Sequence, residues 1–229
     1  MARPQLLPCD ADALIQAFLS NNVKPLQVLH RRFGIQPVVV PEVELELRSN
    51  RKFGQRIAPE LKKALGTGVL RVLDNTVLEN LFPGPSASTS AAATISAIQT
   101  LGSQYEVNVD FGEAYTHAAA VTLGVPSLSH DITALRALVN AGARVPDPVL
   151  RWFDLMVLAL QVGEMSQAEC DTVRKTLCAL SEWVPLSFQH DSFRGGLSSF
   201  CPRILDGNLA PIGAPTAKVG APFANRLVL

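Results

Sequence analysis

The stretch IQPVVVPEVELELRS, residues 35–49, indicates the fold class of this chain. Its first part is a short apolar run, which is typical of a strand buried on both faces. Pro41 then stands at the first position of a helix, which is the position that helices favour for proline. The glutamates and leucines after it continue a helical pattern. A buried strand that passes directly into a helix is the repeating unit of parallel α/β sheets.

The same alternation of strand and helix extends in both directions from this stretch. Residues 83–97 are rich in Ala, Ser and Thr, and we expect a loop there, followed by a helix that begins between 86 and 90. The pattern predicts an α/β protein of three layers, α/β/α, with a central and mostly parallel sheet. The other strands are predicted at 4–9, 69–73, 125–129 and 143–145, and the other helices at 12–19, 25–33, 52–65, 111–123, 132–142, 147–162 and 166–183.

The composition changes after residue 183. Residues 184–229 are rich in Gly, Pro, Ala and Ser and show little periodicity. We therefore predict one folded domain over residues 1–183 and an irregular C-terminal arm over 184–229, ordered only against the body, a partner or another subunit.

Charge and hydropathy limit the classes of function. The 229 residues carry 20 Lys+Arg and 20 Asp+Glu, so the net charge of zero gives no general attraction to nucleic acid. Only 17% of the residues are charged, and we expect an oligomer or a partner protein to cover part of the surface. No apolar run is long enough for a signal peptide or a membrane span, and the four cysteines form no CxxC pair. These features predict buried thiols and a cytoplasmic protein.

Acidic side chains follow or open several of the apolar runs. The loops at the carboxyl ends of parallel strands meet at one edge of a sheet, so these carboxylates are expected to approach one another there. Like charges at close range repel unless a cation neutralises them, and Mg²⁺ and Mn²⁺ prefer oxygen ligands. The side chains concerned are Asp10, Glu46, Asp110, Glu113 and Asp131.

These motifs resemble, in their order, those of the PIN-domain family, the fold of VapC-type toxin ribonucleases. Asp10-Ala-Asp12 resembles the opening motif, although Ala11 stands where Thr is usual and Asp12 where Asn or Ser is common. Glu46 before Leu resembles the second motif. Gly112-Glu113-Ala resembles a Gly-Glu-Ala subgroup, and Leu-Ser-His-Asp131 resembles the fourth acidic motif. The resemblance covers residues 4–182.

The resemblance implies a metal-dependent endoribonuclease, the toxin of a toxin–antitoxin pair and a homodimer. Mg²⁺ or Mn²⁺ would be held by Asp10, Glu113 and Asp131, with Asp110 as the alternative to Glu113 and with Glu46 as a further catalytic residue. Asp12 and Ser129 would support these ligands. The RNA backbone would follow a dense basic run, which consists of Arg48, Arg51, Lys52 and Arg56.

Two other functions stay open. A PIN-fold protein that has lost its activity and serves as an interaction module suits the neutral, apolar composition. A phosphatase of the haloacid dehalogenase type is suggested by Asp10-Ala-Asp12, which resembles its nucleophile motif. Leu14 stands where that family has Thr or Val, and no clear paired acidic motif follows, so this alternative ranks lowest.

Overall fold

The computed structural model describes residues 5–81, 83–84, 86–197 and 199–200. Its strands are β1 (Gln5–Pro8), β2 (Ile35–Val39), β3 (Arg71–Val72), β4 (Ser127–Leu128) and β5 (Val149–Leu150). All pairings are parallel: β1 pairs with β2, β2 with β3, and β4 with β5. A parallel bridge from Cys9 to Leu128 joins the two small sheets, so the strands follow the spatial order β3-β2-β1-β4-β5.

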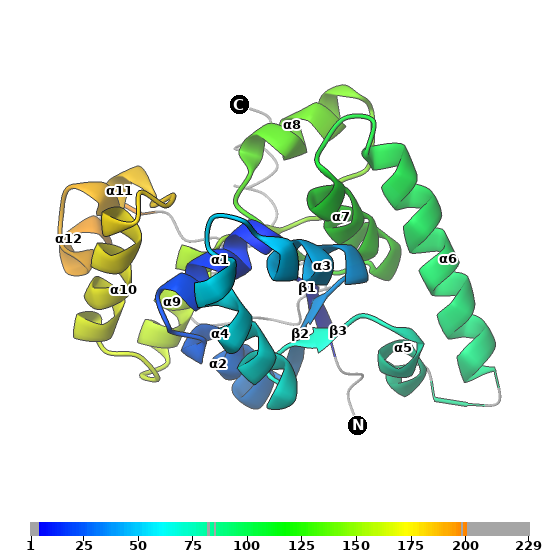
Figure 1. The fold of residues 1–229 in the computed structure, drawn as a ribbon, viewed down its shortest axis with the longest axis horizontal. Helices are drawn as coiled ribbons and strands as arrows, with labels where there is room; N and C mark the ends of the chain where they lie inside the picture. The colour runs from blue at the N-terminus through cyan, green and yellow to red at the C-terminus, as the bar shows by residue number, and fades with distance from the viewer. Residues whose placement is uncertain (1–4, 82, 85, 198, 201–229) are drawn as a thin grey trace.

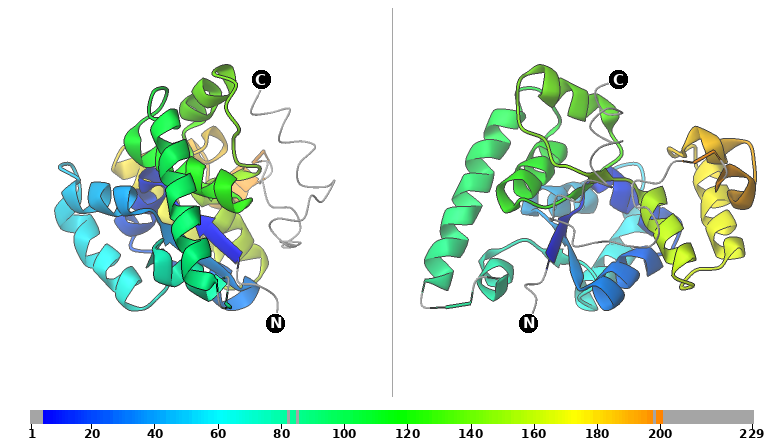
Figure 2. Two further views of the ribbon diagram at one scale, coloured as in Figure 1. Left: turned by 90° about the vertical axis from the view of Figure 1, so that its right-hand side faces the viewer. Right: turned by 180° about the vertical axis from the view of Figure 1, so that it is seen from behind.

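Helices cover both sides of these strands, which confirms the predicted α/β class. Figures 1 and 2 show α3 and α4 on one side and α9 on the other. The helices are α1 (Ala11–Leu19), α2 (Lys24–Phe33), α3 (Pro41–Ser49), α4 (Gly54–Gly66), α5 (Asn75–Leu81), α6 (Ala87–Tyr105), α7 (Phe111–Leu123), α8 (Ile132–Asn140), α9 (Trp152–Gln161), α10 (Gln167–Ala179), α11 (Leu186–Gln189) and α12 (Phe193–Leu197).

Local signals in the sequence explain where several helices begin and end. Gly34 and Gly124 terminate α2 and α7 in the left-handed conformation, with φ of 66° at each, which glycine adopts without a steric penalty. Ser166 and Glu169 form a capping box at the start of α10. The expected loop before residues 86–90 is also confirmed, because α6 begins at Ala87.

The last strand lies elsewhere than predicted. We expected it at residues 143–145 and a helix from 147, but the strand is β5 at Val149–Leu150 and the helix α9 begins at Trp152. Pro146 and Pro148 disfavour helix for the residues that precede them. Arg151 then caps α9, with its main-chain N–H donating to Asp154 Oδ2 at 2.8 Å.

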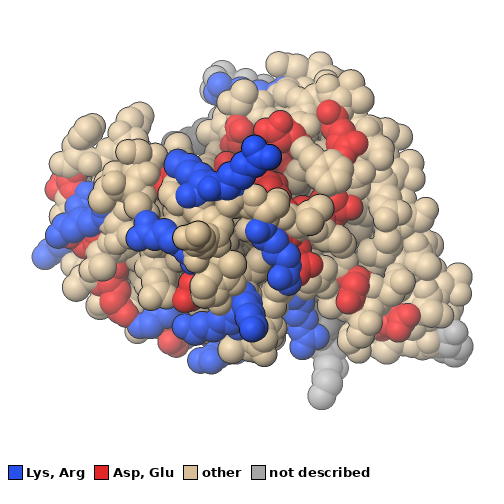
Figure 3. Space-filling model, in the orientation of Figure 1, with Lys and Arg blue, Asp and Glu red and all other residues tan. Residues whose placement is uncertain are grey.

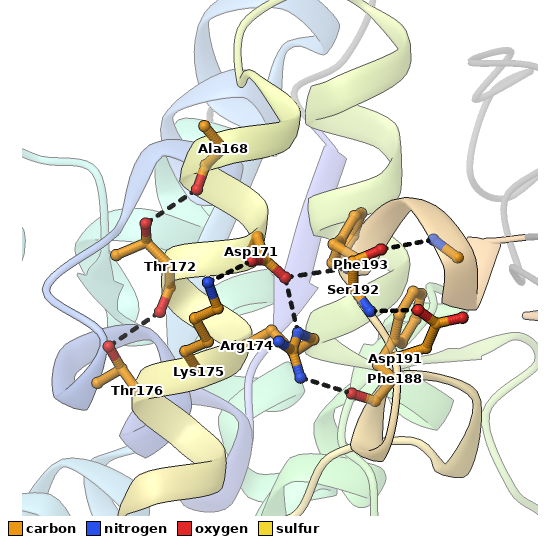
Figure 4. Close-up of polar contacts among 11 residues, drawn as sticks. Ala168, Asp171, Thr172, Arg174, Lys175, Thr176, Phe188, Asp191, Ser192 and Phe193 are labelled. Carbon is orange, nitrogen blue, oxygen red and sulfur yellow. Dashed lines mark hydrogen bonds and ion pairs between the residues drawn. The ribbon is translucent and has the colours of Figure 1, made fainter.

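The first part of the predicted arm folds against the body. Figure 4 shows α10 joined to the chain of α11 and α12 by a carboxylate–guanidinium network. Asp171 Oδ1 accepts from Phe193 N at 3.0 Å and from Arg174 Nε at 2.8 Å, and Arg174 Nη1 donates to Phe188 O at 3.2 Å. The aromatic rings of Phe188 and Phe193 stack, with their centroids 4.6 Å apart. Residues 201–229 of the predicted arm lie outside the described residues.

Replacing Asp171 by Ala is expected to lower the free energy of unfolding by about 1–3 kcal/mol, because it removes charge-assisted hydrogen bonds and leaves the N–H of Phe193 without its acceptor. Lys175→Ala is the matched control: its exposed ammonium also pairs with Asp171, at 2.9 Å, and we expect a change below about 0.5 kcal/mol. Urea denaturation of the full chain measures both, and equal effects would contradict this role of Asp171.

The same carboxylate adds a dependence on pH. Bonds from Lys175 and then Arg174 hold the pKa of Asp171 well below its usual range. Its contribution to stability is therefore present above the pKa of the unfolded chain, near 4, and is lost as the pH falls below that value. The Asp171→Ala variant is expected to lack this part of the acid sensitivity.

Cys9 and Cys170 are buried free thiols, as expected, whereas the free thiol of Cys178 is only partly buried. Cys201 lies outside the described residues. None of the helices in the described part of the chain is long and apolar enough to cross a membrane.

Candidate functional site

The carboxyl ends of β1 and β4 meet at the point where the strand order reverses. The chain passes from β1 outward to β2 and β3, and then returns to the other side of β1 with β4 and β5. In open parallel sheets, ligands bind in the crevice at this switch point. The main chain of Asp10 is fixed there, with its N–H donating to Leu128 O at 2.8 Å, and Ser129 follows β4 directly. The fold therefore brings the first and fourth acidic motifs to one edge.

Asp10 is a buried carboxyl at the start of α1, with 2% of its surface exposed. Burial raises its pKa to about 8, and the neighbouring charges of Asp12 and Glu46 act in the same direction. At neutral pH and without a cation, this group therefore holds a proton.

Glu113 lies in the first turn of α7 and is 8% exposed. Burial raises its pKa to about 9, with further contributions from Asp10 and then Asp131. Its Oε1 is buried and has no hydrogen-bond partner among the described residues. A buried polar atom without a partner costs free energy, which water or another ligand at this atom would reduce.

Glu46 reaches the same region from α3. A Cβ atom added at Gly112 would overlap Glu46 Oε2, so the glycine at the start of α7 makes room for this carboxylate. Burial raises the pKa of Glu46, and Asp12 and Asp110 add to the shift. The structure thereby selects Glu46 from the three glutamates of α3 as the one that lies against the Gly112-Glu113 turn.

Asp131 serves as the N-cap of α8. Its Oδ1 accepts from Thr133 N at 2.6 Å and from Ala134 N at 3.1 Å. Ser129 is fully buried, and its Oγ accepts from the N–H of Asp131 at 3.3 Å. Asp131 thus has a structural role at the helix terminus, while its charge also acts on Glu113.

Asp12 and Asp110 lie at the exposed edge of the acidic site. The side chain of Asp12 is 58% exposed and lies 3.8 Å from His130 Nε2. Asp110 is exposed at the N-cap of α7. Of the two alternatives at this turn, Glu113 is the buried one, so Asp110 contributes charge from outside.

A contact between distant segments lies beside the site. His130 stacks on Trp183, with ring centroids 5.0 Å apart, and Gln16 Nε2 donates to Trp183 O at 2.7 Å. Sequence reasoning did not identify Trp183, because no local pattern connects a residue after α10 with one before α8. His117 is buried, and burial lowers its pKa to about 4, so it is neutral.

The donors of this site fit a hard divalent cation by their chemistry. They are carboxylate oxygens whose protonation is favoured by burial and mutual repulsion, and a cation would relieve both. As the side chains stand, no group of three or more His, Cys, Asp or Glu within the described residues is arranged to hold a metal ion. Binding would therefore require a rearrangement of side chains at this site.

The basic run divides into paired and unpaired cations. Arg48 Nη2 lies 2.6 Å from Glu44 Oε1, and Lys52 Nζ lies 2.9 Å from Glu182 Oε1. Arg51 and Arg56 are exposed, and neither forms an ion pair with another described residue. Figure 3 shows blue side chains beside a concentration of red ones on the face that carries α1, α3 and α7. A basic strip of exposed cations suits a backbone of phosphates.

None of the family models, curated proteins or solved structures compared with this chain matches it. The resemblance to the PIN-domain family therefore stays a prediction.

Proposed function

We propose that this protein binds Mg²⁺ or Mn²⁺ through Asp10 and Glu113 and hydrolyses phosphodiester bonds of RNA. The observation that carries the proposal is the pair of buried carboxyls at the switch point, one of which has an oxygen without a partner in the described residues. Two such groups raise the free energy of the metal-free protein. Perturbed carboxyls of this kind gather at functional sites.

A bound divalent cation would activate water and stabilise negative charge that develops on the phosphate. Asp10 and Glu113 would release their protons as the ion binds. Glu46, placed against Gly112, adds a third carboxylate, and Asp131 contributes its charge while Ser129 fixes its main chain. Burial, followed by the charges of Asp12 and Asp110, raises the pKa of Glu46, which makes its carboxylate a better proton acceptor than an ordinary glutamate.

RNA would be held by exposed cations beside the acidic site. Arg51 and Arg56 are the better candidates of the basic run, because Arg48 and Lys52 are already paired with carboxylates. By the family resemblance, the protein would be a toxin with an antitoxin partner and would act as a homodimer.

The test is cleavage of a mixed-sequence RNA by the full chain with Mn²⁺ and with EDTA, together with calorimetric titration of Mn²⁺. We expect cleavage with Mn²⁺ alone and binding that strengthens as the pH rises, because the carboxyls must lose their protons. If the protein neither cleaves the RNA nor binds Mn²⁺, this result would support the second candidate, an inactive interaction module. That candidate is favoured by the absence, within the described residues, of a preformed group of metal ligands.

Removing the charges of Arg51 and Arg56 is expected to weaken RNA binding and to make it less sensitive to salt. Each phosphate contact contributes about 0.7 to the slope of log affinity against log salt for a single strand, so the double alanine variant should lower the slope by about 1.4. Filter binding of RNA at low to moderate salt measures this slope, with the alanine substitutions made in a catalytically inactive variant.

The matched control removes the two paired cations, Arg48 and Lys52, as a double alanine variant. Because each is already close to a carboxylate, at 2.6 Å and 2.9 Å, we expect a smaller change of slope. Equal changes of the salt slope in the two double variants would show that position within the run does not matter. Arg51 and Arg56 would then not be specific contacts of the RNA.

A further inference from the structure

A pocket opens at the same edge of the sheet, beside the acidic site. It has a volume of about 220 Å³, far above the ~15 Å³ that a single water requires. Val40 follows β2 and Leu73 follows β3, and both line it, while Ile98 of α6 forms the outer wall. These three side chains are almost completely buried. The pocket is therefore an apolar slot at the carboxyl ends of β2 and β3.

Tyr115 supplies an aromatic wall of this pocket. Its ring lies 5.0 Å from that of Phe111 in a tilted arrangement, and its hydroxyl is 3.2 Å from Ser103 Oγ. Gly102 approaches the ring so closely that a Cβ there would overlap it. The ring is thus held in one position, as a stacking surface requires.

The polar groups of the pocket are acceptors and amides. Glu42 and Asp74 carry negative charge, and Asn75 and Gln99 carry amides. Asp74 is fixed by the N–H of Val77, which donates to its Oδ1 at 2.8 Å. No Lys or Arg lines this pocket in the described part of the chain. It would repel a phosphate and favour a molecule that presents hydrogen-bond donors.

We propose that this pocket receives a nucleobase with an exocyclic amino group from the RNA substrate, an inference that rests on the proposed function. A base is flat and apolar on its faces, which suits Tyr115 and Ile98, and the amino group donates to Glu42 at the rim. Single-stranded RNA is generally recognised by this combination of stacking and edge hydrogen bonds.

The elements that build the pocket also build the acidic site. Glu42 and Glu46 both belong to α3, and Tyr115 and Glu113 both belong to α7. The two features therefore lie side by side on one edge of the sheet. A strand of RNA whose phosphate reaches the carboxylates would place a neighbouring base over the pocket.

The first experiment measures binding of cytidine, adenosine and uridine to the full chain by ligand-observed NMR. Nucleosides are used because they lack the phosphate that the acidic rim repels. We expect cytidine and adenosine to bind about tenfold more tightly than uridine, because a carboxylate acceptor meets an amino group in the first two and a carbonyl in uridine. Glu42→Gln is expected to remove the preference, since an amide pairs with either.

A second pair of variants tests the place of binding. Ile95 lines the pocket from α6 and is partly buried, so Ile95→Phe should fill the space and reduce nucleoside binding at least about tenfold. Ala97→Phe puts the same ring on the exposed face of α6 and serves as the control for folding and for non-specific stacking. Binding that survives Ile95→Phe, or that is lost equally in Ala97→Phe, would overturn the proposal.

Cleavage of oligonucleotides that differ at one base distinguishes this inference from the proposed function. Metal-dependent cleavage with no preference among bases, together with no nucleoside binding, would overturn only the proposal that the pocket binds a base. An apolar protein segment would then be the remaining occupant of the pocket. Nucleoside binding with the expected preference but no cleavage would overturn the nuclease and make a free nucleoside the ligand. If both assays show the preference and Glu42→Gln removes it in both, the results would support an RNA base as the occupant of the pocket.

Discussion

Replacing Asp10 by Asn is expected to abolish metal-dependent RNA cleavage and, at the same time, to stabilise the metal-free protein. The loss of rate should be at least about 10²–10³-fold, because the amide removes a charge that the cation requires. Asn has nearly the same shape, so the packing of this buried position is retained. Opposite effects of one substitution on activity and stability are the signature of a strained functional group.

The gain in stability follows from the pKa of Asp10. The group has an ordinary pKa of 3.8, and burial followed by the charges of Asp12 and Glu46 raises it to about 8 in the folded chain. Between these values the folded state keeps a proton that the unfolded state has released. The stability of the metal-free protein therefore falls as the pH rises from about 4 to about 8, by up to about 1.4 kcal/mol per pH unit for this group.

The Asn side chain does not titrate, so the variant should be less sensitive to pH and, at pH 7.5, more stable by about 1–3 kcal/mol. Thermal unfolding in EDTA from pH 5 to 9 measures this difference. Glu106→Gln, the same change at an exposed carboxylate at the end of α6, is the control and should leave both cleavage and the pH profile as in the wild type. An active Asp10→Asn protein, or identical pH profiles, would refute the role of Asp10.

The sequence predicted the main elements because their signals are local. Gly34 and Gly124 end helices by a backbone conformation that belongs to a single residue, and the capping box at Ser166 spans one turn. Strand β5 was misplaced since two residues, Val149–Leu150, are too short to show alternation. Helix α5 was not predicted at all; its seven residues, NTVLENL, follow a strand of only two.

The arrangement of the candidate site was predictable only in part. The rule that parallel strands end at one edge brought Asp10 and Asp131 together in sequence reasoning, and the bridge from Cys9 to Leu128 places their strands side by side. No local pattern could tell Glu46 from its neighbours, because the choice depends on the approach of α3 to Gly112. The pairing of Arg48 and Lys52 with carboxylates likewise depends on side-chain contacts in the folded chain.

Replacing Gly112 by Ala is expected to impair metal binding and cleavage by about 10–100-fold without destabilising the protein. The added Cβ would overlap Glu46 Oε2 and displace this carboxylate from its place against the start of α7. Displacement of a group that supports a metal site has costs of this size. The fold itself should tolerate the change, because the atom that must move is the end of a flexible side chain.

The helix should even gain from the substitution. Gly112 lies in the first turn of α7 with an ordinary negative φ, and alanine is favoured over glycine in helices by up to about 1 kcal/mol. Release of Glu46 from a place where burial raises its pKa adds to the stability of the metal-free chain. We therefore expect an equal or higher melting temperature together with weaker Mn²⁺ binding by calorimetry.

Two comparisons make this result specific. Gly66→Ala changes a helical glycine around which no described atom lies within 4 Å of the added Cβ, so it should stabilise α4 and leave Mn²⁺ binding and cleavage unchanged. In a Glu46→Ala background, Gly112→Ala should have no further effect on metal binding, because the group it displaces is already absent. If the two substitutions instead reduce metal binding additively, Gly112 affects the site through a residue other than Glu46. In that case the space needed by the Glu46 carboxylate does not explain why a glycine precedes Glu113.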